Sequence, residues 1–202
     1  MTYRSILVDS DSLGRQIAGM HDDDTLFEAS TRWWAETRGD PERLRSWLLA
    51  QYRGEVTAAE RILGLRDRFA APGSRAHRLL TVIAGQERAH ADWVGELLVA
   101  RGQVPVVQGE AMARFWRHTL PAITDLETGC AVGAHAEQMR LVRISVIAAD
   151  PGAPADVREV FARILPQERF HERAFRSLAT AESLEATRGA HELGLLALGL
   201  SA

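Results

Sequence analysis

The sequence predicts an all-α protein built on a four-helix bundle of two antiparallel helical hairpins. Apolar residues recur every three or four positions over four long stretches, which is the period of an amphipathic helix. Short Pro- and Gly-containing turns end the first and third stretches, whereas residues 102–121 separate the second from the third. There is little strand signal beyond Val104–Val107. Two short turns and one long connection therefore predict two hairpins joined by a long crossover.

Length and composition indicate one soluble domain. The chain has 202 residues, of which 46% are hydrophobic and 25% charged, with a net charge of −3 and no basic block. We therefore expect neither nucleic acid nor a membrane as a partner. Cys130 is the single cysteine, which excludes an internal disulfide and a four-cysteine metal site and suits a reducing compartment. The N-terminus lacks a signal-peptide pattern and the apolar run Leu193–Leu200 is too short to span a bilayer, so a cytoplasmic protein is predicted.

The N-terminal residues 1–40 form an extension ahead of the bundle. The acidic run Asp22–Asp24 could cap a short helix over Thr25–Arg38. A break follows at Gly39, where Asp40 is the expected N-cap of the first long helix and Pro41 its first residue. The extension could cap the bundle or form a subunit contact.

The remaining elements follow from the same periodicity. We expect the four long helices over residues 41–70, 74–100, 122–149 and 154–180, a short amphipathic piece over 110–118 and a last helix over 183–200. Residues 1–202 are thus one domain, with the bundle at 41–180 and a C-terminal helix at 181–202. Pro166 is expected to kink the fourth long helix or to mark a local irregularity just before the site. The last helix is expected to pack on the bundle or to form a dimer contact.

Two Glu-x-x-His runs mark the centre of the predicted bundle. Glu87 and His90 lie in the apolar seam of the second long helix, and Glu168 and His171 lie in the seam of the fourth. Residues three apart share one face of a helix. Burying a carboxylate and an imidazole in that way is costly unless a partner such as a metal ion compensates for it.

Each run has a glutamate upstream on the preceding helix. Glu55 precedes Glu87 by 32 residues, and Glu137 precedes Glu168 by 31, so the two hairpins read as an internal repeat. Glu60 is the rival to Glu55, but it falls on a polar face of its helix.

These six groups suit two metal ions. Four carboxylates in a dry core would repel one another, and two divalent cations would balance their charge. Oxygen-rich ligands with one nitrogen per ion favour iron or manganese over zinc or copper. The candidate metal ligands, and the candidate catalytic residues, are Glu55, Glu87, His90, Glu137, Glu168 and His171.

With these motifs, residues 41–180 resemble the ferritin-like superfamily of di-iron carboxylate proteins, in the manner of rubrerythrin and bacterioferritin. The resemblance implies two iron ions, with manganese or a mixed manganese–iron pair as variants. It also implies that Glu87 and Glu168 bridge the ions. Glu55 with His90, and Glu137 with His171, would then be the terminal ligands.

The resemblance implies an oxidoreductase that activates dioxygen or peroxide to oxidise a small substrate. An oxygenase would also need an external electron donor, and we expect a homodimer. The alternatives are an iron-binding, ferroxidase or storage protein, and a metal-free helical interaction module. Rubrerythrin-like peroxidases carry a second carboxylate one turn after the first on the third helix, where this chain has Arg140.

Some residues near the predicted site have simpler interpretations. Cys130 is expected to be a small buried side chain, and His135 a surface or interface histidine. Arg140 could pair with a ligand carboxylate or reach solvent.

Overall fold

The structure is a computed structural model that describes residues 26–108 and 113–200 of the chain, and these residues form helices and no strands. The prediction of an all-α protein is confirmed over this part of the chain. Besides a helix at residues 26–38, the elements are α2 (Pro41–Phe69), α3 (Arg75–Val99), α4 (Ala113–Thr119), the 3-10 turn η1 (Leu120–Ala122), α5 (Leu126–Ala149), α6 (Ala155–Leu178) and α7 (Ala181–Leu198).

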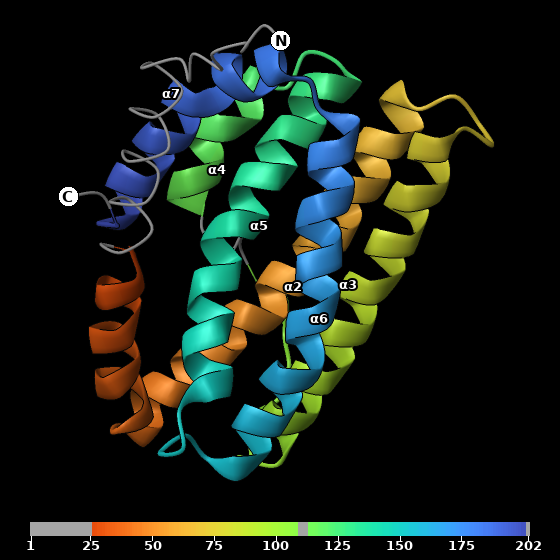
Figure 1. Cartoon of the computed structure of the whole chain (residues 1–202). Helices are drawn as coiled ribbons and strands as arrows, with labels where there is room; N and C mark the ends of the chain where they lie inside the picture. The colour runs from red at the N-terminus through yellow and green to blue at the C-terminus, as the bar shows by residue number, and fades with distance from the viewer. Residues whose placement is uncertain (1–25, 109–112, 201–202) are drawn as a thin grey trace, which may run out of the picture.

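Four long helices lie side by side in the structure (Figure 1). α2 packs along α3 and α5 packs along α6, and each pair is joined by a short turn. The connection from α3 to α5 is long and contains α4 and η1, while residues 103–108 at its start have no regular secondary structure. The structure therefore has the two predicted hairpins and the long crossover between them.

Side-chain caps set the helix boundaries. The carboxylate of Asp40 accepts the backbone N–H of Glu42 at 2.9 Å, as predicted for the start of α2. The start of α5 differs from the prediction, which placed it at Ala122. Asp125 and Thr128 form a capping box that begins the helix at Leu126, and η1 precedes it as a separate turn.

Two apolar clusters fill the bundle, one toward each end. The first contains Trp34, Leu48, Val94, Ile147 and Phe161, among others. The second contains Ile62, Leu80, Ile83, Cys130 and Phe175, among others. Apolar burial of this extent is the main stabilising contribution to the fold. The predicted ligand residues lie on the same four helices, between the positions that supply the two clusters.

α5 is buried on more faces than its sequence predicted. A single seam was expected, but α4 and α7 also pack in this region, α7 directly on α5, and Ala136 and Met139 are buried beside Phe115. Gly194 permits α7 to pack against Phe115 of α4, because a Cβ atom at this position would lie 2.5 Å from the Phe115 ring. Of the two roles expected for the C-terminal helix, packing on the bundle is therefore observed.

The described part of the N-terminal extension packs on the bundle. The indole N–H of Trp34 donates to Asp150 Oδ2 at 2.9 Å, and Arg38 pairs with the same carboxylate at 2.9 Å. These contacts tie residues 26–38 to the turn between α5 and α6. The acidic run predicted to cap this helix lies outside the described residues.

Two smaller expectations can be compared with the structure. α6 runs as one continuous helix through Pro166, the position at which a kink or a local irregularity was expected. None of the described helices has both the length and the apolar character needed to cross a membrane.

Candidate metal centre

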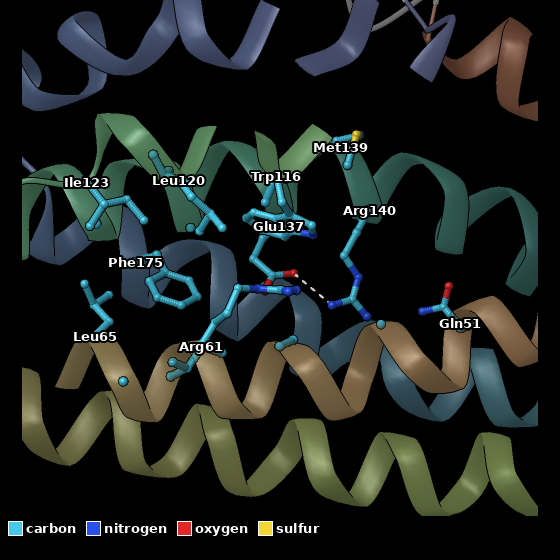
Figure 2. Close-up of a pocket in the computed structure, with 18 of the residues that line it drawn as sticks. Gln51, Arg61, Leu65, Trp116, Leu120, Ile123, Glu137, Met139, Arg140 and Phe175 are labelled. Carbon is cyan, nitrogen blue, oxygen red and sulfur yellow. Dashed lines mark ion pairs between the residues drawn. The ribbon is translucent and has the colours of Figure 1, made fainter. Parts of the chain in front are cut away.

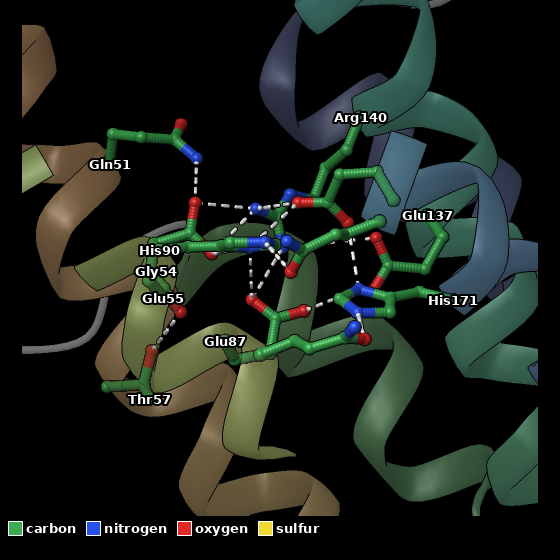
Figure 3. Close-up of polar contacts among 12 residues, drawn as sticks. Gln51, Gly54, Glu55, Thr57, Glu87, His90, Glu137, Arg140 and His171 are labelled. Carbon is green, nitrogen blue, oxygen red and sulfur yellow. Dashed lines mark hydrogen bonds and ion pairs between the residues drawn. The ribbon is translucent and has the colours of Figure 1, made fainter. Parts of the chain in front are cut away.

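The six predicted ligand side chains meet in the interior of the bundle. Glu55 comes from α2, Glu87 and His90 from α3, Glu137 from α5, and Glu168 and His171 from α6. All six are buried, and Figure 3 shows the polar ends of Glu55, Glu87, His90, Glu137 and His171 turned toward one another. The sequence-based prediction that these residues converge is confirmed.

The ligand atoms fall into two overlapping groups. Glu55, Glu87, His90 and Glu168 offer atoms that all lie within 4.8 Å of one another, and so do Glu87, Glu137, Glu168 and His171. Glu87 and Glu168 belong to both groups, which is the arrangement expected of carboxylates that bridge two ions. The rival, Glu60, is exposed on α2.

Both histidines are oriented by a glutamine of the opposite hairpin. The ring N–H at Nε2 of His90 donates to Gln167 Oε1 at 3.1 Å, and Nε2 of His171 donates to Gln86 Oε1 at 2.9 Å. With its Nε2 bonded in this way, each ring turns Nδ1 toward the carboxylates. A metal-binding histidine usually donates its other ring N–H to such a partner.

The two glutamines were missed at the sequence level, although a signal for them exists. Gln86 directly precedes Glu87 and Gln167 directly precedes Glu168, so the repeated string is Gln-Glu-Arg-x-His and not only Glu-x-x-His. The crossed bonds between the strings give the site an approximate twofold arrangement.

Several buried polar atoms of the site have no hydrogen-bond partner. They are both carboxylate oxygens of Glu87, Nδ1 of His90 and Oε2 of Glu137. A buried polar atom without a partner costs about 1–3 kcal/mol. Four such atoms in one cluster indicate that the side chains are arranged for a ligand that is itself positively charged.

The separations around His90 suit a shared ion better than hydrogen bonds. Its Nδ1 lies 3.8 Å from Glu55, 3.7 Å from Glu87 and 3.5 Å from Glu168. Hydrogen bonds to a ring nitrogen are shorter. For ligand bonds of about 2.1 Å, two ligands of one ion are separated by about 3.0 Å at a right angle and by about 4.2 Å when they lie opposite each other, and the three separations fall between these limits. The residues present therefore fit a metal ion.

Arg140 enters the site from α5. Its Nη2 donates to Glu55 Oε1 at 2.7 Å, to Glu55 Oε2 at 2.8 Å and to Glu168 Oε1 at 2.9 Å. Of the two positions expected for this side chain, pairing with a ligand carboxylate is therefore observed. The guanidinium supplies one positive charge to the four carboxylates and competes with any ion for Glu55 and Glu168.

The carboxylates differ in their ionisation. Burial raises the pKa of Glu87 and of Glu168, but the positive charge of Arg140 and the nearby histidines outweigh burial and bring both pKa values well below the ordinary range. Burial together with the charge of Glu168 instead raises the pKa of Glu137 well above its usual value. The protonated form of Glu137 is therefore favoured in the metal-free chain.

The histidines compensate for the remaining charge. Burial lowers the pKa of His90, but the nearby carboxylates of Glu168, Glu55 and Glu87 outweigh it and raise the pKa to about 12. The pKa of His171 is raised for the same reasons, by Glu168 and Glu87. Because metals bind the deprotonated forms of these groups, the raised pKa values of His90, His171 and Glu137 mean that metal binding releases protons.

The neighbouring residues have structural roles. Cys130 is buried and burial raises the pKa of its thiol to about 12, so it behaves as the small buried side chain that was predicted. His135 lies between α5 and α7, where its ring stacks on His191 at 4.9 Å and its Nε2 donates to the Leu184 carbonyl at 3.1 Å. It is an interface residue within the chain.

A cavity of about 520 Å³ opens beside the site, between α2 and α5. Glu137 and Arg140 form part of its wall, as Figure 2 shows. Most of the other lining residues are apolar. The carboxylate cluster is thus adjacent to a space large enough for a small organic molecule.

Comparison with known proteins gives no match to the chain among family models, curated proteins or solved structures.

Proposed function

We propose that this chain is a non-haem dimetal oxidoreductase of the ferritin-like kind, which uses dioxygen or peroxide to oxidise a small organic substrate. The carrying observation is the cluster of buried atoms without a hydrogen bond at Glu87, His90 and Glu137, inside two overlapping four-residue groups. Iron is the favoured metal, because each group supplies three carboxylates and one imidazole. When bound, the ions would supply the redox chemistry that no amino-acid side chain provides.

The residues have distinct parts in this proposal. Glu87 and Glu168 would hold both ions, while Glu55 with His90 and Glu137 with His171 would each complete one. Gln86 and Gln167 keep the histidine Nδ1 atoms directed at the ions. Glu137, whose protonated form is favoured without metal and which lines the cavity, would release its proton on binding an ion.

Arg140 has two roles in the proposal. Without metal it neutralises the buried carboxylates, and it would have to release Glu55 and Glu168 for them to hold an ion. It also lies in the wall of the cavity, where its charge can orient an incoming molecule. A cavity beside the cluster supports a substrate oxidase over the alternative of an iron store, which needs only a path for ions.

The test is iron loading followed by exposure to oxygen. Ferrous iron titrated anaerobically should bind at about two ions per chain, and the loaded protein should consume oxygen once oxygen is admitted. Glu87→Gln and Glu168→Gln should abolish both effects. Glu60→Gln, an exposed position on the same bundle, serves as the control and should leave both unchanged. Iron binding that survives both site substitutions would show the site to be wrong.

One observation favours a second candidate, a metal-free helical module. Arg140 and the two histidines already pair with the carboxylates, so the cluster could serve as a buried ion network that specifies the fold. In that case anaerobic iron would not bind, and adding it would leave the melting temperature unchanged.

A further inference from the structure

The cavity beside the metal centre is long and narrow. It is lined along α5 from Gly129 to Ile147, which spans about 27 Å at the helical rise per residue. A volume of about 520 Å³ spread over that length leaves room for an extended molecule. Figure 2 shows the course of this space, from Leu65, Ile123 and Phe175 past Glu137 and Arg140 toward Gln51.

Glycines form part of the cavity wall. Gly129 and Gly133 of α5 lie in the wall, and a Cβ atom at Gly133 would come within 2.8 Å of the Phe175 ring. Gly64 of α2 also lies in the wall, and a Cβ atom there would meet nothing within 4 Å. With Leu65, Ile123 and Phe175, these positions form an apolar end that would accept a hydrocarbon chain.

Positive charge dominates the ionisable part of the wall. Four arginines line the cavity with a single glutamate: Arg61, Arg68, Arg140, Arg143 and Glu137. Arg143 is half-buried and forms no ion pair with any residue in the described parts of the chain; its guanidinium lies 4.4 Å from the Trp33 ring centre. Burial lowers the pKa of Arg143. A guanidinium in this position is stabilised by an anion from outside the chain.

We infer that the cavity binds an elongated, apolar carboxylic acid. Its carboxylate would pair with Arg143, and its chain would run past Glu137 and Arg140 to the apolar end at Phe175. This order follows from α5, on which Arg143 lies one turn beyond Arg140 and Gly133 lies one turn before Glu137. That the acid is also the substrate of the metal centre rests on the proposed function; that it binds does not.

The binding test uses dodecanoate and the full chain. Calorimetric titration, with quenching of the fluorescence of cavity residues Trp47 and Trp116, should show one molecule bound per chain. Affinity should increase about threefold to fourfold per methylene from octanoate to dodecanoate. 1-Dodecanol, which has the chain and no charge, should bind at least about tenfold more weakly than dodecanoate.

Two substitutions locate the ligand. Gly64→Phe should fill the cavity and weaken dodecanoate binding at least about tenfold. Gly189→Phe is its matched control, since Gly189 is also an exposed helical glycine with nothing within 4 Å but lies outside the cavity wall. Arg143→Gln should remove the preference for dodecanoate over 1-dodecanol, and Arg143→Lys should retain it.

The outcomes separate this inference from the proposed function. Absence of dodecanoate binding, or equal weakening by Gly64→Phe and Gly189→Phe, would overturn the cavity assignment. A preference for the acid that survives Arg143→Gln would overturn the role of Arg143. Iron binding is measured on the same preparations. If the chain binds iron but not the acid, only this inference is overturned. If it binds the acid but not iron, only the proposed function is overturned.

Discussion

At the scale of single residues, the glutamines behind the histidines explain why both rings turn Nδ1 inward. Gln86 and Gln167 accept from His171 and His90 across the two hairpins. Replacing either with Leu should weaken manganese or iron binding about 10–100-fold, because the ring loses the partner that fixes its tautomer. Metal titration followed by electron paramagnetic resonance measures this. Gln108→Leu, at an exposed position, should have no effect.

Replacing Arg140 should have opposite effects on the stability of the metal-free chain and on its affinity for metal. Arg140→Gln should destabilise the metal-free chain by about 3–5 kcal/mol, because buried carboxylates lose their guanidinium. The same change should tighten metal binding by at least about tenfold, since a competing positive charge is removed. Thermal melts with and without manganese test both effects. If the variant loses stability and metal affinity together, Arg140 supports the site and does not compete with the ion.

At the scale of the helices, packing between α5 and α6 depends on Gly133. Gly133→Ala should lower the free energy of unfolding by about 1–3 kcal/mol, because its Cβ would collide with the buried Phe175 ring. Gly85→Ala on α3 should raise it by up to about 1 kcal/mol, since its Cβ meets nothing within 4 Å and alanine favours the helix. Urea denaturation of both variants provides the comparison, and equal effects would contradict this account of the packing.

The helices were largely predictable because local chemistry fixes their ends. Asp40 and Ser74 cap α2 and α3 as their sequence positions indicate. The start of α5 was wrong by four residues, because Asp125 with Thr128 caps the helix while Leu120–Ala122 form a separate turn. The burial of further faces of α5 could not be read from its own periodicity, since α4 and α7 cover them.

The site was predictable where one helix face decides burial, and not where separate elements meet. The six ligand candidates lie in apolar seams, so their convergence followed from the pattern. The direction of Arg140, the crossed bonds of Gln86 and Gln167, and the cavity all depend on the spacing between helices. No single stretch of sequence encodes that spacing.

At the scale of the whole molecule, the ionisation of the site predicts how stability depends on pH. The pKa of His90 rises from 6.5 to about 12 on folding. The stability that this ring contributes is therefore fully present below about pH 6.5 and is lost as the pH rises toward 12. His171 and Glu137 are shifted in the same direction. Glu87 and Glu168 have lowered pKa values, so their contribution is lost on acidification below about pH 4.5.

The metal-free chain should therefore be most stable near pH 5–6 and lose stability above that, by roughly 1.4 kcal/mol per pH unit for each such proton. Denaturation between pH 6 and 9 measures the slope. His90→Gln should flatten it, and His118→Gln, at an exposed position, should not. A slope that is unchanged in His90→Gln would contradict the assignment of the proton to this ring.

The most direct test of the central claim is anomalous diffraction from crystals of this protein grown anaerobically with manganese or ferrous iron. We predict two anomalous peaks about 3.5–4 Å apart, between the carboxylates of Glu87 and Glu168, with Arg140 withdrawn from Glu55. No peak at this position, with Arg140 still bonded to Glu55 and Glu168, would contradict the dimetal site.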